Sequence, residues 1–234
     1  MNARDVRLVR PLAAALSAAA LVTSVSLASC NGTACFGMDS CGGGTGPLPS
    51  VGVSGTAATG RALAGAAVSF GCADGSASTT SDSGGRYSVT FNASLPCILA
   101  ASSAGTTLHS VVFAGGTINT TPETELMLVY LAAQLGTSVS GLVASLPNNT
   151  HFQQALSNGT NVLAAQSAVV ANLQQRYTVT LAQPSFLTTP FVVGQPGVDS
   201  DLDALAKAGA IDSNGLPDAA AVSLLAQAGS AHPL

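Results

Sequence analysis

The hydrophobic periodicity of this chain changes near residue 119, and this change limits the folds that are open to it. Between residues 51 and 118 the apolar residues fall in short β-type runs, which turn signals separate at roughly eight- to twelve-residue intervals. After residue 119 the apolar residues recur at helical spacing. We therefore predict an α+β protein, with an N-terminal antiparallel β-sandwich over 51–118 followed by an Ala-rich helical domain over 119–234.

The expected elements follow from the same pattern. The strands are expected at Val51–Ser54, Ala66–Gly71, Ser76–Thr80, Tyr87–Phe91, Ile98–Ala101 and Thr107–Phe113. Thr121 and Pro122 are a typical helix start, and Gly136 is the expected end of that helix. Further helices are expected at Thr160–Tyr177, Asp201–Ala208 and Pro217–Ala228.

The first thirty residues have the order of a secretory signal. Three arginines within Met1–Arg10 precede an apolar stretch from Leu12 to about Val25, which is shorter than the roughly 20 residues a membrane-spanning helix needs. The sequence Leu27-Ala28-Ser29-Cys30 then resembles the lipobox of bacterial lipoproteins. The resemblance implies that residues 1–29 are a removable signal peptide and that Cys30 carries the lipid. The alternative is an ordinary signal peptide followed by a chance cysteine.

Residues 30–50 contain Gly42-Gly43-Gly44 and Pro47 and are predicted to be a lipidated flexible tether. In the lipoprotein family an Asp directly after the lipidated Cys favours the inner membrane. Asn31 stands at that position here. The resemblance therefore implies a cell-envelope protein anchored by lipid, and favours the outer membrane of a Gram-negative bacterium.

The charge of the chain argues against nucleic acid as a partner. Removing residues 1–29 takes away three of the seven basic and one of the eleven acidic residues, which leaves a formal charge of −6. The remaining chain has a single lysine, Lys207, whereas phosphate binding needs clustered Lys and Arg. Charged residues make up 8% of the chain, against about 25% in ordinary domains, so most of its surface must be neutral.

The cysteines indicate an oxidising compartment. Five are present, and four remain if Cys30 carries lipid. We predict the disulfides Cys72–Cys97 and Cys35–Cys41. Metal binding is the rival interpretation, but the spacings include no C-x-x-C motif and no His lies nearby.

A resemblance to a known family is carried by a set of Gly, apolar and turn residues. They are Gly55, Gly60, Leu63, Gly65, Ala66, Val68, Thr80, Asp82, Gly84, Gly85, Arg86 and Tyr87. This set resembles the carboxypeptidase regulatory-like, transthyretin-like β-sandwich, which implies an Ig-like fold but no activity. The helical region is similar to the part that follows this sandwich in uncharacterised proteobacterial envelope lipoproteins.

Candidate chemical groups have simpler structural interpretations. Asp82-Ser83-Gly84-Gly85 is similar to the segment around a serine-protease nucleophile, but a tight turn explains the same residues. The three histidines, His109, His151 and His232, are scattered, and Glu123 and Glu125 fit an acidic first helical turn.

Asp199, Asp201 and Asp203 alternate as calcium ligands can. The sixth and twelfth loop positions lack the Gly and Glu of an EF-hand, and an acidic helix start capped by Asp199 or Ser200 needs no metal. We therefore expect no metal, no cofactor and no catalytic residue.

The sequence predicts a non-enzymatic, lipid-anchored cell-envelope protein with a binding or structural role. One alternative is an envelope carbohydrate-binding module or enzyme with a site between the two domains, signalled by a polar cleft where Asp199 to Asp203, His151 or Arg176 converge. Another is an inhibitor or assembly factor for an envelope protein partner, signalled by an exposed apolar patch or an open sheet edge.

Overall fold

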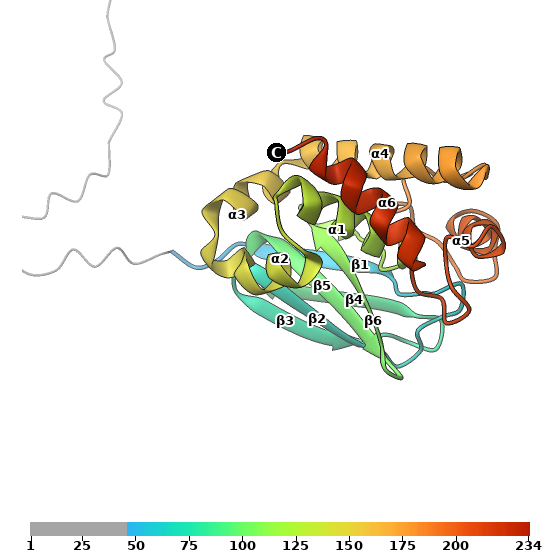
Figure 1. Ribbon diagram of the computed structural model, residues 1–234. Coiled ribbons are helices and arrows are strands. Elements are labelled where there is room, and N and C mark those ends of the chain that lie inside the picture. The colour runs from blue at the N-terminus through green and yellow to red at the C-terminus, as the bar shows by residue number, and fades with distance from the viewer. Residues whose placement is uncertain (1–45) are drawn as a thin grey trace, which may run out of the picture. The chain divides into compact units, whose positions relative to one another are not determined.

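The strands of the chain form two sheets (Figure 1), as described by a computed structural model for residues 46–234. The first has the order β4-β1-β7 and the second the order β3-β2-β5-β6. The strand bounds are β1 Ser50–Thr56, β2 Ala67–Asp74, β3 Ser76–Thr80, β4 Arg86–Asn92, β5 Ser94–Ser103, β6 Thr106–Val112 and β7 Gly116–Thr117. All of these strands except β7 were expected from the sequence, with ends shifted by up to a few residues.

Alternation of side chains explains how the two sheets pack. In β2 the side chains of Val68, Phe70 and Cys72 are buried, whereas the residues between them are exposed. The Phe70 ring lies 5.2 Å from that of Phe91 and 6.4 Å from that of Tyr87, both on β4. The apolar faces of the two sheets therefore meet through aromatic contacts.

One strand pair differs from the antiparallel pattern predicted over 51–118. β1 pairs antiparallel with β4 but parallel with β7, which matches Val53 to Gly116 and Ser54 to Thr117. The chain leaves β6, crosses to the other sheet and enters β7 in the direction of β1. A two-residue strand has too little alternation to be recognised in a sequence, so β7 was missed.

The helices follow the sheets in the sequence. Their bounds are α1 Pro122–Gln134, α2 Val139–Ser145, the 3-10 helix η1 Leu146–Asn148, α3 Thr150–Ser157, α4 Gly159–Tyr177, α5 Val198–Lys207 and α6 Ala219–Ser230. The predicted start of α1 is confirmed, because the side chain of Thr121 accepts a hydrogen bond from Thr124 N–H and the Thr124 hydroxyl oxygen accepts one from Thr121 N–H. Gly136, just after this helix, has a φ of +67°.

Two helices were not predicted. α2 and α3 are seven and eight residues long, and they are capped by the side chains of Ser138 and Asn149. Such short helices show little more than two turns of periodicity, so their apolar residues are too few to form a stripe in the sequence. They gain their stability from packing, through buried Leu142 in α2 and Phe152 and Leu156 in α3.

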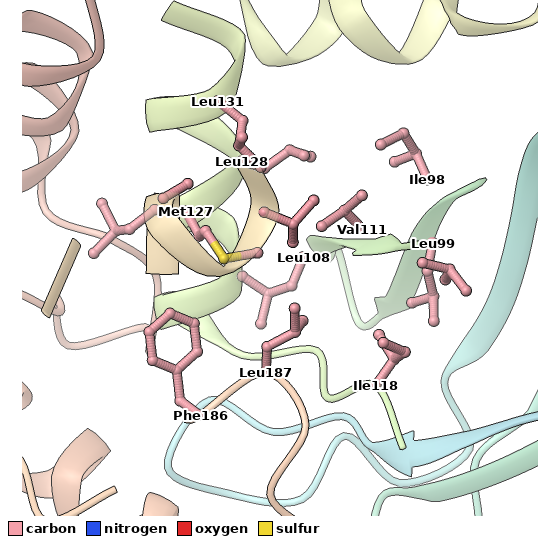
Figure 2. Packing of buried hydrophobic residues seen from close by; sticks show 14 of the residues in the cluster. Ile98, Leu99, Leu108, Val111, Ile118, Met127, Leu128, Leu131, Phe186 and Leu187 are labelled. Carbon is pink, nitrogen blue, oxygen red and sulfur yellow. The ribbon is translucent and has the colours of Figure 1, made fainter. Parts of the chain in front are cut away.

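The hydrophobic core joins the sheets to the helices. Figure 2 shows Met127, Leu128 and Leu131 of α1 facing residues of β5 and β6, with Phe186 and Leu187 from the segment before α5 at the side. All five of these side chains are fully buried. The described residues 46–234 belong to one compact unit, so the change at residue 118 marks a change of secondary structure inside a shared core.

α1 also covers the outer edge of the larger sheet. β6 is the last strand of that sheet. The N–H of its residue His109 donates to Glu125 Oε2 at 2.5 Å, and the Thr124 hydroxyl donates to the His109 carbonyl at 2.9 Å. Side chains from the first turns of α1 thus replace the missing neighbouring strand at this point.

Among the described helices, no single one is both long and apolar enough to cross a bilayer. α1 together with the segment 139–148 reaches the required length and composition only as a pair bent by 76°.

Candidate functional site

The cysteine pair predicted inside the sheets forms a disulfide. Cys72 on β2 and Cys97 on β5 are directly opposite in the strand register, and the structure contains the bond between them. Both cysteines are buried in the interior. Cys30, Cys35 and Cys41 lie outside the described residues.

The segment with a protease-like sequence forms a turn. Asp82 Oδ1 accepts hydrogen bonds from Gly84 N–H at 2.8 Å and from Arg86 N–H at 2.9 Å, and Gly85 has a φ of +79°. The hydrogen bond from the Arg86 backbone lowers the pKa of the Asp82 carboxyl below its ordinary value. These contacts assign Asp82 and its neighbours to the β3–β4 connection.

The acidic residues at the start of α5 hold neighbouring loops in place. Asp201 accepts from Ala182 N–H at 2.8 Å and from Gln183 N–H at 2.7 Å, one with each carboxylate oxygen. Asp199 Oδ2 accepts from Gly194 N–H at 2.7 Å, and burial raises the pKa of Asp199. The helix cap is Gly197, whose N–H donates to the Ser200 hydroxyl, so the predicted cap at Asp199 or Ser200 was wrong by two or three residues.

Asp203 is exposed, whereas Asp199 and Asp201 are buried. It lines a small surface hollow together with Ser200. Within residues 46–234 no cluster of three or more His, Cys, Asp or Glu side chains is arranged to hold a metal ion. Two of the three aspartates considered as calcium ligands are instead hydrogen-bonded to backbone N–H groups.

Glu123 is a fully buried acid in the first turn of α1. Neither of its carboxylate oxygens has a hydrogen-bond partner in the part of the chain that the structure describes. Burial, and secondly the charge of Asp201, raise the pKa of Glu123 well above its ordinary value. Burial therefore favours the protonated, uncharged form of Glu123 in the folded protein.

Glu125, two residues later, faces a different part of the molecule. Its Oε2 atom lies 2.9 Å from His109 Nδ1 and also accepts the His109 N–H. Both side chains are mostly buried, with 17% and 21% of their surface exposed. The two glutamates therefore diverge, as their spacing predicted, but Glu125 gains a histidine partner 16 residues away that no local pattern indicated.

His109 lines an open groove of about 560 Å³ between β6 and α2. The remaining lining comes from the start and the outer face of α2, and includes the Ser138 and Ser140 hydroxyls and the Val139, Val143 and Ala144 side chains. The groove places His109, which is bonded to Glu125, beside two hydroxyl groups. It is therefore the strongest candidate functional site in the described chain.

A second hollow, of about 350 Å³, lies where β1 and β4 meet the segment Pro190–Val192. Most of its polar groups stabilise the fold. Tyr87 donates its hydroxyl proton to the Ile118 carbonyl, and Asn119 donates to the Phe186 and Thr189 carbonyls. Arg86 is exposed there and pairs with Asp82 at 3.3 Å.

The residues expected to mark a cleft between strands and helices do not come together. Asp199 and Asp203 line one small hollow, and Arg176 lines another between α4 and α6. Arg176 lies over the ring of its neighbour Tyr177, at 5.7 Å from the centroid. His151 is near Phe152 at the start of α3 and lines neither hollow.

Comparisons of the chain with known protein families, with curated proteins and with solved structures found no match.

Proposed function

We propose that this chain is a lipid-anchored, non-enzymatic binding protein of the bacterial cell envelope. The observation that carries the proposal is the buried Cys72–Cys97 disulfide. Disulfides of this kind persist outside the reducing cytosol, which agrees with an exported chain. The lipobox-like sequence ending at Cys30 precedes this unit and would hold it at a membrane surface.

The fold proposed for the strand region is the transthyretin-like sandwich of the carboxypeptidase regulatory-like family. Its support is the turn at Asp82–Gly85 and the packing of Phe70 between the sheets against Tyr87. In this chain the helices form part of the same core, which leaves the groove beside His109 open at the junction of strands and helices.

The anchor is tested in a Gram-negative host that expresses the chain. We expect labelled palmitate to enter the wild-type protein and the protein to fractionate with outer membranes. Cys30→Ala should lose both the label and the membrane association. Cys35→Ala is the matched control, since it removes a nearby cysteine and should keep the anchor. Unchanged labelling in Cys30→Ala would contradict the proposal.

The binding role is tested by cross-linking in living cells, followed by mass spectrometry of the membrane-extracted protein. We expect one dominant envelope partner in wild-type cells and its loss with Cys30→Ala. Such a result would support a structural or assembly role. If no protein is cross-linked, the binding role requires a small ligand, which the groove beside His109 could accommodate.

A further inference from the structure

The groove between β6 and α2 has one polar side and one apolar side. His109 lies on β6, and the Ser138 and Ser140 hydroxyls lie at the start of α2. The side chains of Val139, Val143 and Ala144 supply the apolar side, and Val143 is 38% exposed. Small-molecule sites are commonly lined by apolar side chains with a few polar groups that fix the orientation of the ligand.

Glu125 determines how His109 can act in the groove. Its Oε2 atom is 2.9 Å from His109 Nδ1 and also accepts the N–H of the same residue, so the ring and its backbone are held by one carboxylate oxygen. The carboxylate therefore favours a proton on Nδ1. Nε2 is the ring nitrogen that remains for a ligand, and in the neutral ring it accepts a hydrogen bond.

The two serines add donors and acceptors opposite the histidine. Ser138 Oγ accepts the Gly141 N–H at 3.1 Å and lies 3.0 Å from Ser140 Oγ. A hydroxyl has one donor and two acceptor positions, so this pair keeps hydrogen-bonding capacity for a further partner. Both serines are exposed, which makes that capacity accessible.

The charge at the groove selects against ionic ligands. The lining includes no Lys, Arg, Asp or Glu, and Glu125 is occupied by His109 from behind. The whole chain carries a net charge of −4, so an anion gains no general attraction. A cation finds no carboxylate in the lining to pair with.

We propose that this groove binds an uncharged, hydroxyl-bearing ligand with an apolar face, of which a neutral saccharide is the simplest example. A ligand hydroxyl donates to His109 Nε2, a second polar group bonds to the serine pair, and the apolar face packs on Val143 and Ala144. The inference deepens the proposed binding role and rests on it.

The test is a titration of the membrane-purified protein, in a detergent without sugar groups, with the disaccharide of N-acetylglucosamine. Its hydroxyls and methyl groups match the two sides of the groove. We expect amide chemical shifts to change at His109 and over residues 138–144. Ser140→Ala and His109→Phe should each weaken binding by about fivefold to tenfold, as expected for one lost hydrogen bond.

Two further variants make the result specific. Val143→Glu places a charge in the groove at an exposed position and should abolish binding without unfolding the protein. Ser102→Ala is the matched control, because Ser102 is an exposed hydroxyl that pairs with Thr107 on the sheet, and it should bind like wild type.

Three outcomes would overturn the inference. Shift changes confined to residues outside the groove would place the site elsewhere, and binding of glucuronate in preference to the neutral disaccharide would exclude an uncharged ligand. Absence of any shift change at millimolar disaccharide would reject the saccharide site. The proposed anchor would survive each of these results, because the palmitate labelling of Cys30 is measured independently.

Discussion

Replacing Glu123 with Met should stabilise the protein. Glu123 is fully buried, and neither carboxylate oxygen has a partner among the described residues. A buried polar group left without a hydrogen bond costs about 1–3 kcal/mol. Met has a similar volume and no polar oxygen, so Glu123→Met should raise the free energy of unfolding by about that amount at pH 4, and by more at pH 7.

The pH dependence of stability distinguishes this explanation from a general packing effect. The pKa of Glu123 is raised in the folded state, so between its ordinary value of 4.5 and the raised value the folded chain holds a proton that the unfolded chain has lost. The stability that this proton contributes is therefore fully present below pH 4.5. It falls by about 1.4 kcal/mol per pH unit as the pH rises, until the folded carboxyl ionises. In Glu123→Met this slope should be absent.

The assay is urea denaturation followed by circular dichroism between pH 4 and pH 8. The difference between the wild-type and Glu123→Met curves isolates the contribution of this one carboxyl, because the other titrating groups are shared. Glu123→Gln removes the charge and keeps the polar shape, and should lose the slope with a smaller gain in stability. Parallel pH curves for wild type and Glu123→Met would refute the reasoning.

Three other substitutions test contacts seen in the structure. Replacing both Cys72 and Cys97 by Ala removes a bond that spans 25 residues and should lower the free energy of unfolding by about 3.5 kcal/mol, measured by thermal or urea denaturation against the oxidised wild type. Asp201→Ala leaves two loop N–H groups without their acceptor and should cost about 2–4 kcal/mol, whereas exposed Asp203→Ala should change little. Thr121→Ala removes the cap of α1 and should cost about 1 kcal/mol, and equal stability to wild type would show that this cap is dispensable.

Local signals predicted the elements that contain them. The Thr121–Pro122 start of α1 and the alternation in β2 each lie within a few residues, so the sequence was sufficient to place them. The same holds for the turn at Asp82, where each bond joins residues at most four apart. The short helices α2 and α3 carry no comparable local signal, because they are stabilised by packing of a few apolar side chains against residues far away in the sequence.

The long segment between α4 and α5 shows why the remaining structure was not predicted. In this segment the carbonyls of Phe186 and Thr189 accept hydrogen bonds from the Asn119 side chain, which lies 67 and 70 residues earlier in the chain. The Leu187 N–H donates to the Gln166 side chain, 21 residues earlier. A polar residue in a linker gives no local sign of such a partner. The candidate site has the same origin, since His109 and Glu125 belong to different elements that only the packing of α1 on β6 brings together.

That packing has a consequence for how the chain avoids self-association. An uncovered outer strand is a template on which another chain can add, and β6 would be such a template if α1 were displaced. Because α1 begins ten residues after β6 ends, the covering helix is synthesised almost together with the strand that it protects. The interval in which neighbouring chains could pair through β6 is therefore short, whereas a truncation between residues 113 and 121 would leave this strand open to fibre-like assembly.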